Sequence, residues 1–205
     1  MAGPEPLPRL PKPIPFESHA LDNLRFIRDT MERAGSFTAV PGWGGVLMGA
    51  TALGAAGLAS HAKSNGEWLA TWLIEVVAAI VVGTLAMWHK ARAAGSPLWS
   101  APARKFAMSF VPAVVAGAVL TLILFKMDAL LVVPGLWLML YGVGIIAGGA
   151  FSVPVVPVMG ALFLIEGVAL ALAQPALAWA DFWLGAGFGG LHVIFGAIIA
   201  KRYGG

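Results

Sequence analysis

The sequence predicts an all-α integral membrane protein, a bundle of six transmembrane helices preceded by a cytoplasmic amphipathic helix. The chain is 59% hydrophobic and only 11% charged, whereas soluble domains carry about 25% charged residues. Its apolar residues fall into runs of about 20, the length that crosses a hydrocarbon core. Its cations gather at alternate junctions between these runs, the pattern that the positive-inside rule describes. The absence of cysteine excludes disulfides, thiolate metal sites and cysteine nucleophiles. The formal charge of +3 reflects membrane topology, and no nucleic-acid partner is expected.

Residues 1–17 form a predicted proline-rich cytoplasmic tail. Six of the 14 prolines lie there, at positions 4, 6, 8, 11, 13 and 15. Proline at this density favours polyproline II and prevents a helix. We expect a linker, with a proline-rich ligand for a partner protein as the alternative.

Residues 18–35 are predicted to form an interfacial amphipathic helix. Apolar residues recur every three or four positions and make one stripe, oppositely charged residues four apart support a helix, and Gly35 is a natural end. Such a helix lies in the membrane interface or packs on the cytoplasmic end of the bundle. Binding a soluble partner through the stripe is the alternative. The stripe consists of Phe16, Ala20, Leu24, Ile27, Met31 and Ala34.

Residues 41–205 make up the predicted six-helix transmembrane domain. Six apolar runs follow one another with short connections, and only the connection at 90–105 is sizeable. The predicted spans cover about 41–61, 67–89, 104–125, 129–149, 153–173 and 176–200.

The distribution of cations predicts the orientation of these spans. With the N-terminus in the cytoplasm, the outer side holds only Lys63 and Lys126, and every other lysine and arginine is cytoplasmic. Both termini are therefore predicted to be cytoplasmic, which requires an even number of spans. The cytoplasmic set is Arg9, Lys12, Arg25, Arg28, Arg33, Lys90, Arg92, Arg104, Lys105, Lys201 and Arg202.

Several predicted spans carry glycines four residues apart, a spacing that lets helix backbones approach closely. Tight helix packing is the expected role of these glycines, and a glycine-lined pore or cofactor slot is the alternative. The pairs are Gly45 with Gly49, Gly144 with Gly148, and Gly185 with Gly189.

Three carboxyl groups on three spans fall at one depth, the outer third of the bilayer: Glu75, Glu166 and Asp181. His61 borders the same layer, and tryptophans surround it. In a functional interpretation these residues bind a cation or a proton, or coordinate a divalent metal with His61. In a structural interpretation each carboxyl is protonated or bonded to a hydroxyl or a tryptophan N–H and orients helices. In a topographic interpretation Asp181 simply lies in the membrane interface.

His192 lies deeper in the last span, eleven residues after Asp181. At about 100° per residue the two side chains return to one helix face. His192 is a candidate axial ligand for a haem or chlorin, or a step in a proton path from Asp181. The alternative is a hydrogen-bonded structural histidine. The identity of any cofactor stays open.

The stretch from Leu24 to Ala34, continuing from Ser36 to Gly45, resembles the opening of a family of uncharacterised bacterial multi-span inner-membrane proteins. The resemblance covers about the first 55 residues. It implies a location in the bacterial cytoplasmic membrane, and it implies no activity and no site residue.

Enzymatic activity is not expected, because the sequence contains no Walker A run, no G-x-S-x-G and no H-E-x-x-H. Two functional hypotheses remain. The first is an accessory or scaffold subunit of a membrane complex, which is slightly preferred because there are few soluble loops. The second is a small transporter or channel for a cation, proton or small solute that uses the outer carboxylates. Beyond the lipid bilayer, the expected partners are further copies of the chain or the subunits of a larger membrane complex.

Overall fold

The computed structural model of the chain describes residues 16–35, 37–95, 97, 99–173 and 179–204. The chain divides into two compact units, Met1–Gly35 and Ser36–Gly205. Residues 1–15, most of the predicted tail, lie outside the described residues. Throughout the described residues the regular elements are helices, apart from one isolated bridge between Phe37 and Ser152.

The first unit contains helix α1 (Phe16–Ala34). The predicted helix at 18–35 is therefore confirmed, and it begins two residues earlier than expected. Its location in the membrane interface stays a prediction.

Among its described residues the second unit contains six helices that are long and apolar enough to cross a membrane, which confirms the predicted number of such helices. Their ends follow local capping. Ser64 begins the second of them, because its hydroxyl accepts from the backbone N–H of Glu67 (3.2 Å). The carboxylate of Glu67 in turn accepts from the backbone N–H of Lys63 (2.8 Å). The first five spans are α2 (Gly42–Ala59), α3 (Asn65–Ala93), α4 (Ala101–Lys126), α5 (Val133–Gly149) with the 3₁₀ turn Leu130–Val132 before it, and α6 (Val155–Ala173).

The last span, Ala180–Tyr203, is not one regular helix. It consists of α7 (Ala180–Leu184), the π-helical segment η3 (Gly185–Leu191) and α8 (His192–Tyr203). A π-helix bonds each residue to the fifth along the chain and so holds more residues in a turn than an α-helix does. The sequence analysis did not predict this segment.

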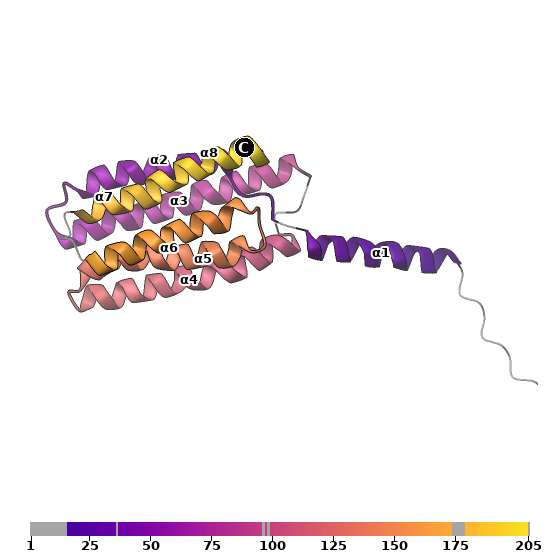
Figure 1. Cartoon of the computed structure of the whole chain (residues 1–205), viewed down its shortest axis with the longest axis horizontal. Coiled ribbons are helices and arrows are strands. Elements are labelled where there is room, and N and C mark those ends of the chain that lie inside the picture. The colour runs from indigo at the N-terminus through magenta and orange to yellow at the C-terminus, as the bar shows by residue number, and fades with distance from the viewer. Residues whose placement is uncertain (1–15, 36, 96, 98, 174–178, 205) are drawn as a thin grey trace, which may run out of the picture. The chain divides into compact units, whose positions relative to one another are not determined.

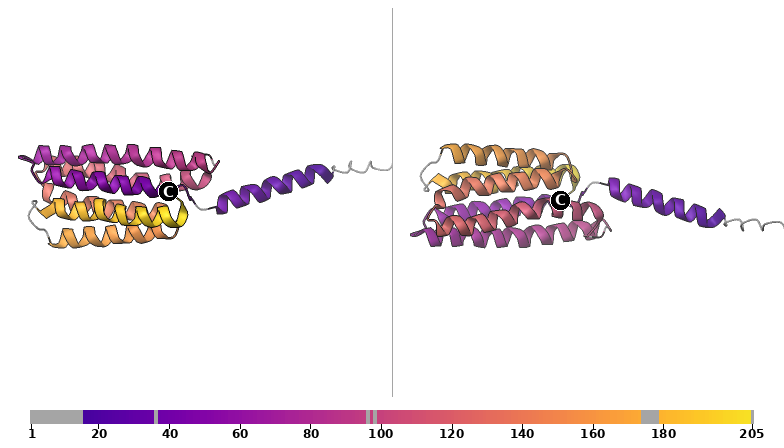
Figure 2. Two further views of the ribbon diagram at one scale, coloured as in Figure 1. Left: turned by 90° about the horizontal axis from the view of Figure 1, so that it is seen from above. Right: turned by 90° about the horizontal axis from the view of Figure 1, so that it is seen from below.

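The six spans form two layers of three helices (Figure 1). In one layer α2 contacts both α3 and α8, and in the other α5 contacts both α4 and α6. Figure 2 shows the layers from above and from below. Large side chains fill the space between the layers, and Trp72, Leu138, Phe163 and Leu184 are fully buried there.

Within each layer the helices approach so closely that only glycine fits. A Cβ on Gly142 of α5 would lie 2.6 Å from the backbone nitrogen of Leu164 in α6. Likewise, a Cβ on Gly49 of α2 would lie 2.6 Å from the carbonyl oxygen of Gly189. The tight-packing interpretation of the glycine-rich spans is thereby confirmed. The contact of Gly42 with Ala200 brings the start of α2 beside the end of α8, so both ends of the second unit lie at one end of the bundle, here called the terminal end.

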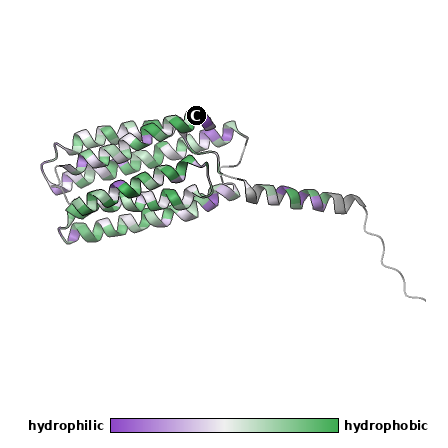
Figure 3. Cartoon of the chain, in the orientation of Figure 1, coloured by the Kyte–Doolittle hydropathy of each residue, from purple (hydrophilic) through white to green (hydrophobic). Residues whose placement is uncertain are grey.

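Hydrophilic residues gather mainly toward the two ends of the bundle (Figure 3), and many large apolar side chains are exposed on its outside. On α3, Ile74 and Val77 are 70% and 62% exposed, and on α4 Val115 is 55% exposed. Such a surface matches lipid, because soluble proteins rarely expose large continuous apolar patches. The second unit therefore has the features of a multi-pass membrane protein.

The glycine contacts predict which substitutions lower the stability of the bundle. Gly142→Ala should lower the free energy of unfolding by about 1–3 kcal/mol, because its Cβ meets the backbone of α6, which cannot move aside freely. Gly54→Ala is the control, since nothing lies within 4 Å of a Cβ at that position. Thermal unfolding in detergent measures both variants, and equal melting temperatures would contradict the packing argument.

Candidate functional site

Asp181 is held by two tryptophans of α3. Its Oδ1 accepts hydrogen bonds from the indole N–H groups of Trp68 (2.8 Å) and Trp72 (2.9 Å). The two indoles share one helix face because they are four residues apart. All three side chains are buried. The carboxylate also lies in the first turn of α7, where the helix dipole favours a negative charge. Asp181 therefore ties the start of the last span to α3.

The same polar contacts continue into the second layer. The indole of Trp68 stacks on that of Trp137 of α5, with ring centroids 5.9 Å apart. The indole N–H of Trp137 donates to the hydroxyl of Thr121 of α4 (2.7 Å), and this hydroxyl donates to the carbonyl of Gly117 (2.7 Å). A connected set of contacts thus joins α7, α3, α5 and α4.

Glu75 has a separate partner. It is 9% exposed, and its Oε1 accepts from the hydroxyl of Thr51 of α2 (2.9 Å). This bond joins the two helices within one layer. For both Asp181 and Glu75 the geometry is the one that the structural interpretation describes, with a hydroxyl or an indole N–H bonded to the carboxyl.

Glu166 differs from the other two carboxyl groups. It projects from α6 toward the π-helical segment, where a Cβ on Gly187 would lie 2.8 Å from its Oε2. Glycine at position 187 is therefore what makes room for the carboxyl group. Its Oε1 is buried, and among the described residues it is the one buried side-chain oxygen or nitrogen without a hydrogen-bond partner. An acceptor left unpaired in an apolar interior costs free energy, so this atom requires an explanation.

His61 lies apart from these groups. Its side chain is exposed at the end of α2, and its Nδ1 lies 2.8 Å from the carbonyl oxygen of Gly57 and 3.2 Å from the hydroxyl of Ser60. Across the described residues, no three His, Asp or Glu side chains are grouped so that they would hold a metal ion. The structure thus brings no three of the four predicted residues together as a metal site.

His192 has a partner on each ring nitrogen. The carbonyl of Phe188 can only accept, so Nδ1–H donates to it (2.8 Å). Nε2 then accepts from the hydroxyl of Tyr141 of α5 (2.7 Å). The rings of Tyr141 and Phe163 lie 5.4 Å from the imidazole. A haem or chlorin would have to displace Tyr141 before Nε2 became available as a ligand.

Asp181 and His192 bond to different helices, Asp181 to the indoles of α3 and His192 to Tyr141 of α5. A π-helical segment lies between the two residues, and in it each residue turns by less than the 100° of an α-helix. The angle calculated for an uninterrupted α-helix therefore does not apply.

Sequence reasoning missed the partners that the structure assigns to these groups. Thr51, Thr121 and Tyr141 carry no signal in the sequence, because each pairs with a residue on another helix. The four-residue spacing of Trp68 and Trp72 was a usable signal that both indoles face one neighbour.

Comparisons with protein-family models, curated proteins and solved structures found no match.

The bonds to Asp181 lead to a stability prediction. Asp181→Ala leaves two buried indole N–H groups unpaired and should destabilise the bundle by about 1–3 kcal/mol. Asp181→Asn is the matched control, because its amide oxygen can still accept from an indole and the loss should be smaller. Thermal unfolding followed by tryptophan fluorescence compares them. If both variants unfold at the same temperature, the indole bonds do not stabilise the fold.

Proposed function

We propose that the chain is a non-enzymatic accessory or scaffold subunit of a larger membrane complex. The observation that carries this proposal is that buried polar side chains are bonded to neighbouring helices. Asp181, Glu75 and His192 are bonded to side chains of neighbouring helices. Groups that carry a solute must exchange partners, whereas these groups hold helices in position. These interhelical bonds favour a rigid bundle, and the outer surface of such a bundle is available to other membrane proteins.

The outer face of α2 offers a surface for such a partner. Gly54 and Gly57 have open space around the position of a Cβ, so neither is required for packing inside the chain. Small residues on an exposed helix face let another transmembrane helix approach closely. A groove beside this face is lined by Leu53, Ala56, Asp181, Phe182, Gly185, Ala186 and Gly190. We propose that a transmembrane helix of the partner, or of a second copy, packs on this face.

We further propose that the terminal end of the bundle faces the cytoplasm of a bacterium, in the inner membrane. Of the eight lysines and arginines in the second unit, Lys63 and Lys126 lie at the opposite end, and the remaining six lie at or beyond the helix ends of the terminal end. The positive-inside rule assigns the cation-rich end to the cytoplasm. The resemblance of the first 55 or so residues to bacterial inner-membrane proteins supports the same location.

Transport of a cation, a proton or a small solute is the second candidate function. It is supported by Glu166, whose buried Oε1 has no partner among the described residues and whose carboxyl group lies against a π-helical segment. Such segments are frequent at functional sites. In this alternative Glu166 handles the solute, while Glu75 and Asp181 hold helices.

The scaffold proposal predicts a loss of partner on filling the face of α2. Gly57→Leu should abolish co-elution of a stoichiometric partner in mild-detergent purification followed by mass analysis, with an unchanged melting temperature. Val115→Leu, on the exposed face of α4, should keep the partner. A wild-type chain that elutes from the native membrane alone, as a monomer, would refute the proposal.

Flux measurements separate the two candidates. Under the scaffold proposal, purified chain in liposomes should carry no proton or cation flux above that of empty liposomes. Flux that is lost in Glu166→Gln and kept in Glu75→Gln, with both variants equally folded, would establish the transport function in its place.

A further inference from the structure

We propose that α1 is a lipid-binding element, whose apolar stripe of Leu24, Ile27 and Met31 inserts into the interface of the membrane that the second unit spans. The inference goes beyond the scaffold function and does not depend on it. According to this inference, lipid covers the apolar stripe of α1.

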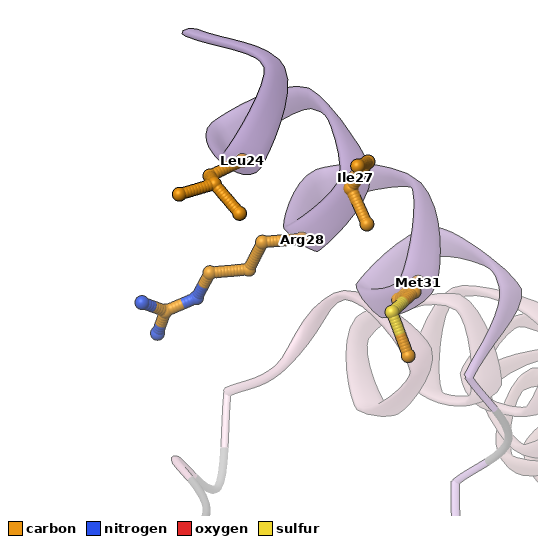
Figure 4. A pocket seen from close by; sticks show the side chains of 4 residues that line it. All are labelled: Leu24, Ile27, Arg28 and Met31. Carbon is orange, nitrogen blue, oxygen red and sulfur yellow. The ribbon is translucent and has the colours of Figure 1, made fainter. Parts of the chain in front are cut away.

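The stripe is exposed along its length. Leu24, Ile27 and Met31 are 63%, 52% and 70% exposed. Their spacing of three and four residues aligns them on one side of the helix, as Figure 4 shows. Most of the stability of helices in proteins comes from burial of an apolar face, so a lasting helix here requires a cover for this stripe.

The chain directly after α1 is fixed to the terminal end of the bundle. The backbone N–H of Phe37 donates to the carbonyl of Phe151 (2.6 Å), and the hydroxyl of Ser152 donates to the carbonyl of Phe37 (2.8 Å). The Phe37 ring is 6% exposed and lies 5.4 Å from the ring of Phe106. Three residues further on, the ammonium group of Lys90 donates to the carbonyl of Val40 (3.0 Å) and also to that of Gly204. Phe37 is therefore an anchor point within the second unit.

This anchor limits how far α1 can move from the membrane. Only Gly35 and Ser36 separate Ala34, the last residue of α1, from Phe37. Three steps of extended chain span at most about 10 Å. The covalent connection thus keeps Ala34 within about 10 Å of Phe37, which lies at the terminal end of the bundle, in whatever direction α1 extends. At that level the closest large apolar phase is the bilayer interface, into which amphipathic helices insert by about 5–10 Å.

The charges of α1 fit a lipid surface. Arg28 lies at the border of the stripe, and its side chain extends past Leu24 with the guanidinium group away from the helix (Figure 4). An arginine in this position can keep its apolar stem at the acyl boundary and its charged head among the phosphates. Acidic and basic residues nearly balance in the helix, with Glu17, Asp22, Asp29 and Glu32 against Arg25, Arg28 and Arg33. Insertion should therefore depend on apolar burial and respond weakly to the charge of the lipid.

The absence of cysteine from the chain allows a direct test on the full-length protein. Nitroxide labels are attached to the single variants Leu24→Cys, Ile27→Cys and Met31→Cys, and to the control variants Asp22→Cys, Phe26→Cys and Thr30→Cys away from the stripe. Each is reconstituted into phosphatidylcholine vesicles with or without phosphatidylglycerol. Accessibility to oxygen, which concentrates in lipid, is compared with accessibility to a water-soluble nickel chelate.

The stripe labels should favour oxygen over the nickel chelate, and the control labels should show the reverse, in both lipid mixtures. Stripe labels that the nickel chelate reaches freely would overturn the proposal, because α1 would then lie in water. Stripe labels shielded from both reagents would overturn it too, because a protein surface would then cover the stripe.

A second variant guards against effects of the labels themselves. Leu24→Gln with Ile27→Gln should make a label at Met31→Cys accessible to the nickel chelate without changing the melting temperature of the bundle. Thr30→Gln should leave that label in lipid. Since the vesicles contain only this chain, the result does not depend on whether a partner subunit exists.

Discussion

Close contact between helix backbones at glycine is the constraint on which the rest of the bundle depends. In hydrocarbon no water competes for apolar surface, so helices associate through tight packing and interhelical bonds. Gly142 and Gly160 meet the backbones of each other's helices, and Gly49 and Gly196 do the same in the other layer. The helices within each layer are therefore closely and rigidly packed. Large rings such as those of Trp72 and Phe163 are held between the two layers.

Polar bonds add a second level of order to this packing. Helices α3 and α4 bury few residues, and several of the interhelical bonds reach them. Asp181 and Glu75 hold α3, while Thr121 of α4 accepts from the indole of Trp137. A polar group at membrane depth is costly to leave unpaired, so these bonds also oppose rotation of α3 and α4 away from the bundle. Glu166 is the exception, since its position against Gly187 satisfies only part of the carboxyl group.

The number and approximate ends of the helices could be predicted from the sequence, because an apolar run of sufficient length has few alternatives. The positions of Glu75, Glu166 and Asp181 along their helices follow from counting residues, because the helices end close to where the apolar runs end. The neighbouring helix that each side chain contacts could not be predicted, because the direction of a side chain around the helix axis depends on how the helices pack. The π-helical segment at Gly185–Leu191 shows the difficulty most clearly. Its glycines have no side chains to reveal the changed turn, and that turn altered the direction of every residue before His192 relative to those after it.

The pairing of α2 with α8 has a consequence for the synthesis of the protein. Of the six spans, α2 is the least apolar and the first to be synthesised, yet Gly42, Gly45 and Gly49 on its face pack against the last span, η3 and α8. During translation the four helices α3 to α6 are made before the last span, so this face of α2 stays uncovered until then. Completion of the bundle thus depends on the sixth span, and a product that stops before that span exposes the close-packing glycine face of α2.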